Sequence, residues 1–360
     1  MSEERLVPKL RFKGFDDEWV IKRLDEISEI NPKTRELPEN FVYIDLDSVN
    51  NGILTKFNKI NKIDAPSRAQ RCLDLNDILF QTVRPYQMNN FFFELNDCDY
   101  VASTGYAQIK SQIFPRFLYY YLHYYKFVND VLNRCTGSSY PAINSTDLKK
   151  IKIKIPSSFN EQKLIGDLFH KIDKKIELLE NKYEYYQYFK KYLMQQIFTQ
   201  KLRFDDNCQY KTKQVKDFLI ESKIEGIDDI NKRLTVKLNL KGITVRESKT
   251  IEIEGATKQF IRKTGQFIYG KQNLHKGAFG IIPKELDGYL TSSDIPSFDF
   301  KGGIEPKWFY YYFARKSFYE KLENLSTGTG SKRISPKEFL NIKIIVPEFK
   351  EQHKIVCLGF

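Results

Sequence analysis

The sequence predicts an α+β protein in which two similar domains follow one another, separated by a long helix of the kind that forms coiled coils. Three observations predict it: the chain repeats itself, each repeat places short β-like segments before an aromatic helix, and an uninterrupted segment of helical periodicity lies between the repeats. A length of 360 residues also exceeds what one average core organises, which favours two or three domains.

The internal repeat keeps one register through most of each half. A proline followed by an aromatic cluster occurs at Pro115–Tyr121 and recurs 191 residues later at Pro306–Tyr312. The other matching pairs, all within one residue of that offset, are Leu10–Phe12 with Leu202–Phe204, Thr136–Ser138 with Thr327–Thr329, Ile151–Pro156 with Ile342–Pro347, and Glu161–Gln162 with Glu351–Gln352. A register held over this length indicates a duplication.

Each half has the same order of elements. Short segments at Trp19–Ile27 and Tyr210–Leu219 come first, and β-like runs broken by Asn, Asp, Pro and Gly follow. The candidate strands are Phe41–Leu46, Ile78–Val83 and Tyr100–Ala102 in the first half, and Leu234–Leu240, Thr250–Ile253, Gln266–Tyr269 and Gly280–Ile282 in the second. Helices begin near Pro115 and Pro306, because proline is favoured in a first turn. A Gly/Ser/Thr loop and a last β-run complete each half.

A long helix is predicted after Pro156. Ser158 and Glu161 fit a capping box at its start, and neither Gly nor Pro interrupts residues 167–201. One helix of about 38 residues would be about 57 Å long. Apolar residues recur along it largely at three- and four-residue spacing, at Ile165, Leu168, Ile172, Ile176, Leu179, Tyr183, Tyr186, Leu193 and Ile197. Such a stripe needs a partner helix, since a small globular domain is too short to cover it.

Composition favours a polyanionic partner and a soluble, cytoplasmic protein. Lys and Arg total 58 against 46 for Asp and Glu, a net charge of +12 that suits nucleic acid or an anionic membrane surface. The alternative is a basic protein with no such partner. The five cysteines are scattered without metal-ligand spacing, which favours reduced thiols and no zinc site. The first residues lack the apolar core of a signal peptide, and no run reaches the about 18 apolar residues of a membrane helix.

Several motifs together resemble those of the specificity subunits of Type I restriction–modification enzymes. They are Pro8–Phe12 followed by Trp19, the Asp77–Phe80 run, the aromatic helices at Pro115 and Pro306, the Thr136–Pro141 stretch, and the Pro-x-x-x-x-Glu-Gln junction at Pro156–Gln162 with its shorter counterpart at Pro347–Gln352. Each motif alone is weak, but their order, spacing and duplication cover nearly the whole chain. The resemblance implies target-recognition domains at residues 1–157 and 204–347, with a spacer helix at 158–203.

The chain departs from the family pattern at its end. Residues 348–360 resemble the start of a second spacer helix that stops early, so we expect a truncated subunit. The first helix would then lack most of its partner. We expect its apolar stripe to be covered by a second copy of this chain or by a modification subunit.

The resemblance implies a non-catalytic subunit that recognises DNA for a restriction system. Each domain would recognise one half of a bipartite, asymmetric site in double-stranded DNA, and the helices would dock modification (methyltransferase) and restriction (translocase) subunits. S-adenosylmethionine, ATP and Mg²⁺ would bind those partners, and this chain is expected to bind no cofactor. Physical chemistry agrees, because joining two DNA-binding domains in one chain raises the effective concentration for the second contact.

In the first domain, the candidate DNA contacts are side chains able to pair with base edges or with phosphates. Base contacts are expected from a Pro/Ser-led loop and from the segment after a predicted strand: Arg68, Gln70, Arg71, Gln81, Arg84, Gln87, Asn89 and Asn90. Ser103, Thr104 and Tyr106 are expected to contact a phosphate or a base. Phosphate contacts are expected from Ser138, Ser139 and Tyr140. The alternatives are a solvated turn and a plain helix-to-strand connection.

The second domain offers a corresponding set. Base contacts are expected from Lys271, Gln272, Asn273, His275, Lys276, Ser292, Ser293 and Asp294, and phosphate contacts from Thr329, Ser331, Lys332 and Arg333. His275 could equally be an inert surface histidine. The Tyr clusters at 119–125 and 310–312 sit beside Leu and Phe, so we interpret them as core packing rather than base stacking.

Catalysis by this chain is not expected. A methyltransferase of this kind would need an Asn/Asp-Pro-Pro-Tyr/Phe loop, and no Pro-Pro occurs. Gly328–Lys332 has the composition of a phosphate-binding loop but not its spacing, and no nuclease constellation is found. A coiled-coil scaffold does not explain two large α+β domains, whereas a stand-alone DNA-binding regulator remains the alternative function.

Overall fold

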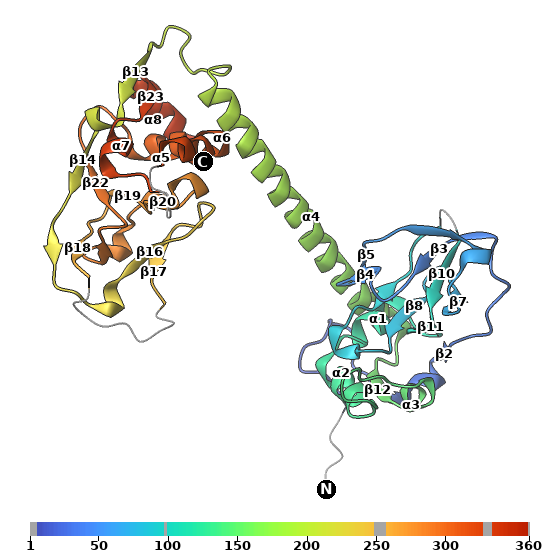
Figure 1. Ribbon diagram of the computed structural model, residues 1–360. Helices are drawn as coiled ribbons and strands as arrows, with labels where there is room; N and C mark the ends of the chain where they lie inside the picture. The colour runs from blue at the N-terminus through green and yellow to red at the C-terminus, as the bar shows by residue number, and fades with distance from the viewer. Residues whose placement is uncertain (1–5, 97–98, 248–256, 327–332, 359–360) are drawn as a thin grey trace. The chain divides into compact units, whose positions relative to one another are not determined.

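The chain divides into two compact units joined by one helix. The computed structural model describes residues 6–96, 99–247, 257–326 and 333–358, and the units are Met1–Asn181 and Lys182–Phe360. The division falls inside α4 (Phe159–Phe198), a continuous helix of 40 residues (Figure 1). The long helix predicted from apolar spacing is therefore confirmed. The predicted strand at Thr250–Ile253 lies outside the described residues.

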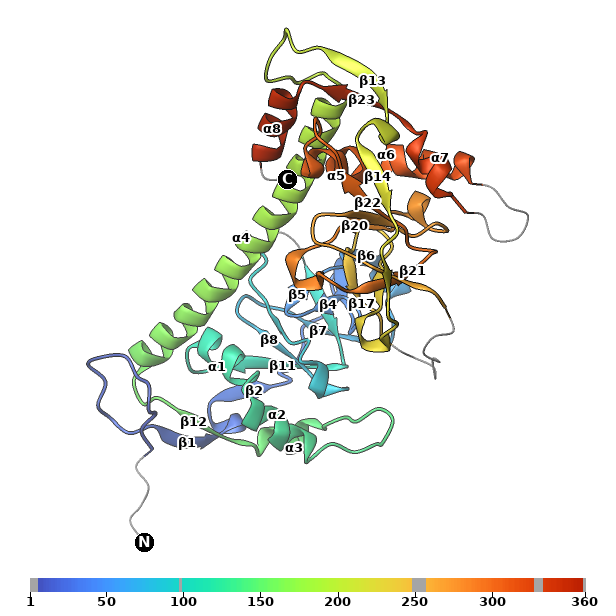
Figure 2. The same ribbon diagram turned by 90° about the vertical axis from the view of Figure 1, so that its left-hand side faces the viewer.

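In unit 1, short helices pack on strands that form two four-stranded sheets (Figure 2). The elements are β1 (Val20–Arg23), β2 (Ser28–Ile30), β3 (Asn40–Ile44), β4 (Val49–Asn50), β5 (Ile53–Leu54), β6 (Asn58–Asn61), β7 (Ala69–Cys72), β8 (Ile78–Gln81), β9 (Phe91–Phe92), β10 (Tyr100–Ser103), β11 (Tyr106–Ser111), α1 (Pro115–Tyr121), α2 (Tyr125–Leu132), α3 (Ser145–Lys149) and β12 (Lys152–Ile155). The first sheet has the order β2-β11-β8-β9, and the second has the order β6-β3-β10-β7.

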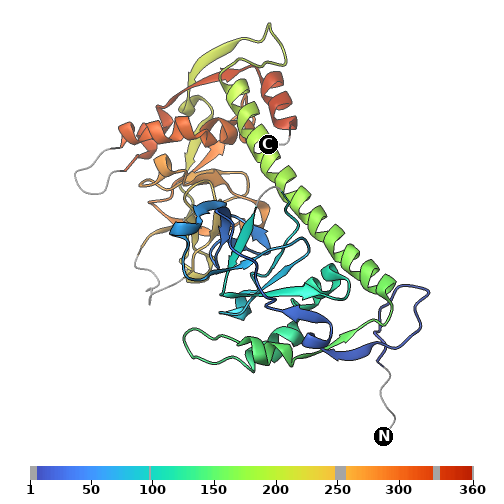
Figure 3. The same cartoon turned by 90° about the vertical axis from the view of Figure 1, so that its right-hand side faces the viewer.

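Unit 2 is built from matching elements around one aromatic core. They are β13 (Tyr210–Gln214), β14 (Leu219–Ser222), β15 (Glu225–Gly226), β16 (Leu234–Val236), β17 (Ile243–Val245), β18 (Gln259–Ile261), β19 (Phe267–Tyr269), β20 (Phe279–Ile281), β21 (Leu290–Ser292), β22 (Ser297–Phe300), α5 (Pro306–Ala314), α6 (Lys316–Tyr319), α7 (Pro336–Leu340), β23 (Lys343–Pro347) and α8 (Phe349–Cys357). Helix α8 packs beside α5 near the last turn of α4 (Figure 3).

Strand order confirms the duplication. The sheet β2-β11-β8-β9 of unit 1 recurs in unit 2 as β14-β22-β19-β20, and the pair β1-β12 recurs as β13-β23. Helices α1, α3 and the first turns of α4 correspond to α5, α7 and α8 by the repeat offset. The α+β class and the tandem arrangement predicted from the sequence are therefore confirmed.

One hydrogen bond occurs in both units and joins two of the sequence motifs, the aromatic helix and the last strand. The hydroxyl of Tyr121 accepts from the Lys154 N–H at 3.0 Å, and the hydroxyl of Tyr312 accepts from the Ile345 N–H at 3.1 Å. These tyrosines join the aromatic helix to the last strand, as expected of core residues. Near them, Phe117 and Trp308 are buried at matching positions, which supports packing for this part of the clusters. The interpretation is wrong for Tyr124 and Tyr125, which are 41% and 61% exposed.

The Glu-Gln junctions connect the first turns of α4 and of α8 to their domains by hydrogen bonds. The amide of Gln162 accepts from the Phe114 N–H at 3.1 Å and donates to the Pro156 carbonyl at 2.8 Å. Gln352 makes the same pair of bonds, from the Glu305 N–H at 2.8 Å and to the Pro347 carbonyl at 3.0 Å. Because one buried amide satisfies two backbone groups, the junction fixes the direction in which the helix leaves the domain.

The capping box predicted at Ser158 and Glu161 is wrong. The Glu161 carboxylate is fully buried and accepts from Arg11 Nε at 2.7 Å, Arg11 Nη2 at 2.8 Å and Trp19 Nε1 at 3.4 Å. A bidentate arginine is a stronger partner than a single backbone N–H, so the tertiary contact displaces the local one. The Pro8–Phe12 motif, which supplies this arginine, thus anchors the helix.

The last turn of α4 is anchored in unit 2. Ile197 is buried there, and the ring of Phe198 lies 6.1 Å from Trp308 and 5.8 Å from Tyr312. In unit 1, the corresponding space beside Phe117 and Tyr121 is an open cavity of about 770 Å³. Across the described residues, no helix combines the length and the apolar character that crossing a membrane requires.

Candidate nucleic-acid interface

Backbone hydrogen bonds bring the predicted contact segments of unit 1 into one row. The Thr104 N–H donates to the Arg68 carbonyl at 2.9 Å, and the Thr82 N–H donates to the Gly105 carbonyl at 3.1 Å. The Arg84 N–H then donates to the Pro141 carbonyl at 2.7 Å. The segments around Arg68, Thr104, Arg84 and Tyr140 are therefore neighbours. We call the exposed and half-exposed side chains along this row the unit 1 ridge: Arg68, Gln70, Arg84, Gln87, Thr104, Ser138, Ser139 and Tyr140.

The arginines of the unit 1 ridge keep their charge available. Arg68 is exposed, and the Arg84 guanidinium lies 4.3 Å from the centre of the exposed Tyr140 ring. Within the part of the chain that the structure describes, neither arginine forms an ion pair, whereas Arg35 is bound by Asp74 and Arg116 by Glu94. An unpaired guanidinium can contact a phosphate or the O6 and N7 atoms of guanine.

The backbone of the ridge is strained at Arg84. Its φ is 55°, and the φ of Met88 is 52°, so non-glycine residues in the left-handed region flank the short helical turn Pro85–Gln87. Such residues cost of the order of 1 kcal/mol or more and persist where the surroundings dictate them, often at functional sites. In this conformation the Arg84 N–H donates to the Pro141 carbonyl, and the Arg84 guanidinium lies over the Tyr140 ring.

Four predicted contacts of unit 1 are corrected, because Gln81, Asn90, Ser103 and Tyr106 are buried. The Gln81 amide donates to Gln87 Oε1 at 2.8 Å and accepts from the Asn89 N–H at 3.1 Å. Asn90 Oδ1 accepts from the Gln81 N–H at 2.9 Å. Ser103 Oγ accepts from the Gly105 N–H at 3.2 Å, and the Tyr106 hydroxyl donates to the Asp45 carbonyl at 3.4 Å. These side chains shape the loops and do not face a ligand.

The remaining two predicted contacts of unit 1, Arg71 and Asn89, are half-buried. Arg71 on β7 is half-buried, its Nε is covered without a hydrogen-bond partner in the described residues, and burial lowers the pKa of its guanidinium. Asn89 is also half-buried, and its Oδ1 accepts from the Asn51 N–H at 3.1 Å. Both lie beside the ridge rather than on it, and their roles as DNA contacts stay predictions.

A neutral histidine supports the ridge from inside. Asn90 Nδ2 donates to His123 Nε2 at 3.3 Å, and His123 Nδ1 donates to the Tyr119 carbonyl at 2.9 Å. The Tyr119 carbonyl favours a proton on Nδ1, and burial favours the neutral ring. Burial accordingly lowers the pKa of His123, although two backbone hydrogen bonds and the charge of Asp173 oppose the shift.

We expect unit 1 to lose stability as the pH falls below 6.5. Unfolded His123 takes up a proton near its ordinary pKa of 6.5, whereas the buried ring does so only at lower pH, so acid favours unfolding. The contribution of the neutral ring is fully present above that pH and is lost as the pH falls through the lowered folded pKa. The substitution His123→Gln should therefore flatten the pH dependence of the thermal midpoint between about pH 5 and 7. The control His170→Gln should retain it, and an unaltered dependence in His123→Gln would contradict the assignment.

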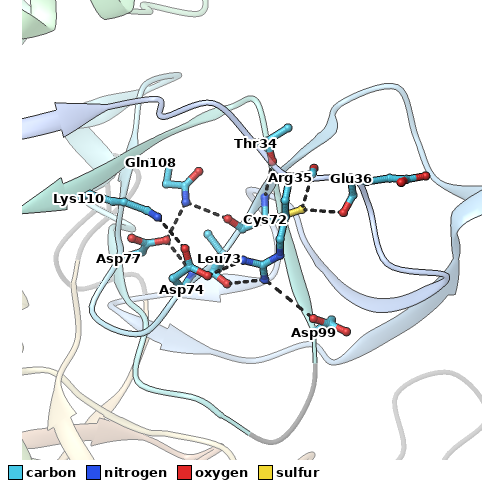
Figure 4. Close-up of polar contacts among 10 residues, drawn as sticks. All are labelled: Thr34, Arg35, Glu36, Cys72, Leu73, Asp74, Asp77, Asp99, Gln108 and Lys110. Carbon is cyan, nitrogen blue, oxygen red and sulfur yellow. Dashed lines mark hydrogen bonds and ion pairs between the residues drawn. The ribbon is translucent and has the colours of Figure 1, made fainter.

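The Asp77–Phe80 motif joins neighbouring segments of unit 1 through the hydrogen bonds of Asp77 (Figure 4). Asp77 is buried and accepts from the Asp74 N–H at 2.8 Å and from Gln108 Nε2 at 2.7 Å. Burial raises the pKa of Asp77, and these hydrogen bonds oppose that shift. Asp74 is held by Arg35 and by Lys110 at 2.6 Å. Both carboxylates are thus engaged in joining strands rather than arranged for chemistry.

In unit 2, the predicted segments also meet. The Lys271 N–H donates to the Asp294 carbonyl at 2.9 Å, and the Ile334 N–H donates to the Lys271 carbonyl at 2.9 Å. Arg333 Nη1 lies 3.2 Å from Asp294 Oδ1. The loop after β19, the turn after β21 and the segment before α7 are therefore neighbours, as their counterparts are in unit 1. The predicted contacts Thr329, Ser331 and Lys332 lie outside the described residues.

The other predicted contact residues of unit 2 differ in how much of their surface is exposed. Gln272, Lys276, Ser293 and Arg333 are exposed, whereas Lys271, Asn273, Ser292 and Asp294 are half-buried. Asp294 positions Arg333, and Ser292 Oγ accepts from the Asp294 N–H at 3.4 Å, so both have a structural use. His275 is half-buried, and its Nδ1 is covered with no hydrogen-bond partner among the described residues.

Sequence reasoning missed a hairpin beside each interface. In unit 1, strands β4 and β5 form a hairpin, and the Asn51 N–H in its turn donates to Asn89 Oδ1 at 3.1 Å. In unit 2, the Asn239 and Leu240 N–H groups donate to the Lys276 and Gly277 carbonyls, each at 2.9 Å. The Asn51-Gly52 dipeptide is a recognisable hairpin signal, with φ of 49° and 77°. Leu240, with a φ of 58°, offers no such signal.

Comparison with known proteins decides the family. A model of the Type I restriction modification DNA specificity domain matches residues 16–187 and matches again at residues 208–357. The chain belongs to the Type I restriction–modification specificity family. This family is a DNA-recognition component, so the chain has a role in DNA sequence specificity. The resemblance drawn from the motifs is thereby confirmed.

Similar proteins agree with this family. Over 149 residues the chain is 28% identical to the Type I restriction enzyme HindI specificity subunit of Haemophilus influenzae. The aligned region covers 39% of this chain and 31% of that one. The chain thus matches about a third of the length of that relative.

Solved structures of the family share the fold. The HsdS subunit from Thermoanaerobacter tengcongensis superposes with a TM-score of 0.54 at 19% identity, over 96% of this chain and 88% of that one. The S subunit of a Type I restriction–modification system from M. genitalium gives 0.56 at 16% identity, over 98% and 91%. At these identities the likeness shows the two-domain architecture with its long helix and nothing finer.

Proposed function

We propose that this chain is the sequence-specific DNA-binding subunit of a Type I restriction–modification complex, and that each unit contacts one half of a bipartite, asymmetric site. Modification and restriction subunits would carry methylation and cleavage, together with S-adenosylmethionine, ATP and Mg²⁺. One observation supports this most: two interfaces of the same topology carry different side chains. They are Arg68, Gln70, Arg84 and Tyr140 in unit 1, and Lys271, Gln272, Lys276 and Arg333 in unit 2.

Different side chains on a repeated frame favour different half-sites. Arginine and lysine pair with guanine, and glutamine pairs with adenine, while hydroxyl groups and backbone N–H groups contact phosphates. Because the repeated backbone presents these groups from the same loops, the two units would bind DNA in a similar way. Their base preferences would nevertheless differ, which makes the whole site asymmetric.

The exposed part of α4 supports a partner helix, and we assign it to a second copy of this chain. Leu168, Ile172, Ile176, Leu179, Tyr183 and Tyr186 are exposed by between 43% and 66% of their surface. Two identical stripes pair antiparallel in a self-complementary way. Ile197 is not part of this surface, because unit 2 buries it. A chain that stays monomeric, or that assembles only with modification subunits, would contradict this assignment.

Replacing Arg84 with alanine should weaken binding to the preferred duplex by about tenfold, because a good arginine–base contact contributes about 1–3 kcal/mol. The chain in complex with its modification subunits would first select that duplex from a random library. Binding would then be measured by fluorescence anisotropy at one fixed salt concentration. Arg23→Ala is the matched control, since that exposed arginine lies on β1, whose sheet β1-β12 contains no ridge residue.

Three results would count against the proposal. Unchanged binding in both Arg84→Ala and Lys276→Ala would remove the assigned interfaces. An equal loss in Arg23→Ala would show that net charge alone is responsible. Selection of a palindrome by a chain that binds no methyltransferase would favour a stand-alone regulator.

A further inference from the structure

The hairpin between β16 and β17 has a tip closed by its own backbone. The strands pair antiparallel, with Leu234 opposite Val245 and Val236 opposite Ile243. Beyond them the Lys237 N–H donates to the Gly242 carbonyl at 2.9 Å, and the Lys241 N–H donates to the Leu238 carbonyl at 3.2 Å. The tip, residues 237–242, is therefore a defined turn rather than an open loop.

The tip is fixed against the interface of unit 2. The Asn239 and Leu240 N–H groups donate to the carbonyls of Lys276 and Gly277, each at 2.9 Å. A Cβ added at Gly277 would lie 3.3 Å from the Leu240 nitrogen, so glycine allows the two loops to approach this closely. The hairpin thus extends the surface that already contains Lys276.

Side chains at the tip divide between core and solvent. Leu240 packs against the aromatic core of unit 2, whereas Leu238 is 42% exposed. Lys237, Asn239 and Lys241 are also exposed, and neither lysine forms an ion pair within the described residues. The exposed Leu238 has no structural use that the surrounding contacts explain, whereas Asn239 also suits the left-handed backbone of the turn.

The backbone at this tip is strained. Asn239 and Leu240 have φ of 57° and 58°, in the left-handed region. A residue with a bulky side chain, such as leucine, adopts this conformation at a cost of roughly 1–2 kcal/mol. The hydrogen bonds to the Lys276 and Gly277 carbonyls hold it there, together with the half-buried Leu240 side chain, which packs against the core. Their effect is to direct Leu238 and Asn239 outward beside Lys276.

Resting on the proposed function, we infer that this hairpin is a second DNA-reading element of unit 2. A two-stranded ribbon fits the major groove of B-DNA. Asn239 would pair with the N6 and N7 atoms of adenine, and Leu238 would contact a thymine methyl group. Lys237 and Lys241 would contact the phosphates on either side and set the depth of insertion.

Unit 1 carries a hairpin in the same place with other side chains. The turn between β4 and β5 rests on Asn89 at the corresponding loop, and Ile53 in it is 58% exposed. A Cβ added at Gly52 would lie 2.6 Å from the Tyr119 hydroxyl, so this turn is pressed against α1. An element kept at both interfaces, with exposed residues that differ, is what base discrimination requires.

The test compares tip variants of the whole chain, in complex with its modification subunits, on the selected duplex and on a random duplex. Asn239→Asp preserves the positive φ but replaces the amide donor with a carboxylate, and Leu238→Ala removes the apolar contact. Each should weaken binding to the selected duplex by about tenfold with little change on the random duplex. Lys237→Ala and Lys241→Ala should weaken binding to both duplexes and lower the salt slope by about one each.

Asn231→Asp is the matched control, because Asn231 is exposed in the same unit and precedes the hairpin. Thermal unfolding of each variant separates a folding defect from a binding defect. If all four tip variants bind both duplexes as the parent does, while Lys276→Ala loses affinity, the hairpin assignment is overturned and the proposed function stands. If the parent shows no preference for any duplex, the proposed function itself fails.

Discussion

Scrambling either half of the selected duplex should lower the affinity of the chain by about a hundredfold or more. When two DNA-binding units belong to one chain, binding of the first makes binding of the second intramolecular, and this raises affinity by about 10²–10⁴. A duplex with one intact half loses that gain and retains only the specific contacts of one unit together with phosphate contacts.

The measurement is a competition assay at one salt concentration, since phosphate contacts make every affinity depend on salt. Scrambling the base pairs between the two halves is the control and should leave the affinity unchanged. Inserting five base pairs there should weaken binding strongly, because it turns one half-site to the opposite side of the helix. Full affinity for a duplex carrying only one half would show that a single unit accounts for recognition.

The second large effect is on stability. Trp308→Ala should lower the free energy of unfolding of unit 2 by about 3–5 kcal/mol, the usual cost of removing a buried aromatic side chain. Trp308 is 1% exposed, and its ring lies 5.2 Å from Tyr312 and 6.1 Å from Phe198 of α4. The variant should therefore also release the last turn of α4, which hydrogen exchange would detect as lost protection around Ile197.

Two variants control this experiment. Phe117→Ala removes the matching residue of unit 1, so it should destabilise that unit and leave the protection of unit 2 intact. Trp308→Phe should cost less than about 1.5 kcal/mol. Unit 1 already has phenylalanine at the corresponding position, and the Trp308 Nε1–H has no acceptor in the described residues. Equal loss of protection in both units after Trp308→Ala would contradict the independence of the two cores.

The elements of the fold were predictable because their signals are local or repeated. Proline starts both aromatic helices, α1 and α5, at the expected residues. The absence of glycine and proline over residues 167–201 marks α4, although the helix spans Phe159–Phe198 and so ends before the predicted limit of residue 203. The repeat was not used to place strands, and β21, the counterpart of β10 in the second half, was missed.

The candidate site was predictable only to the level of segments. The loops chosen in each half do come together, since they follow neighbouring strands. Within them, however, residue type did not reveal direction: Gln81 and Asn90 are as polar as Gln87, yet both are buried to satisfy backbone groups. Which amide faces inward depends on contacts with residues distant in the sequence.

Long-range partners explain the other errors. Glu161 had a plausible local role three residues after Ser158, but Arg11 reaches it from 150 positions away and takes both carboxylate oxygens. Similarly, Leu240 adopts a positive φ because Gly277 lets the loops approach and its half-buried side chain packs against the aromatic core. Neither contact leaves a pattern within a short window of sequence.

Selection from random duplexes tests the central claim most directly. The chain in complex with its modification subunits would be incubated with a library, and the bound fraction would be sequenced. We expect two short, different blocks of preferred bases, separated by a constant number of base pairs without preference, and we expect Lys276→Ala to alter one block only. A single continuous block, a palindrome, or no enrichment would contradict the assignment of two separate DNA-recognition units to this chain.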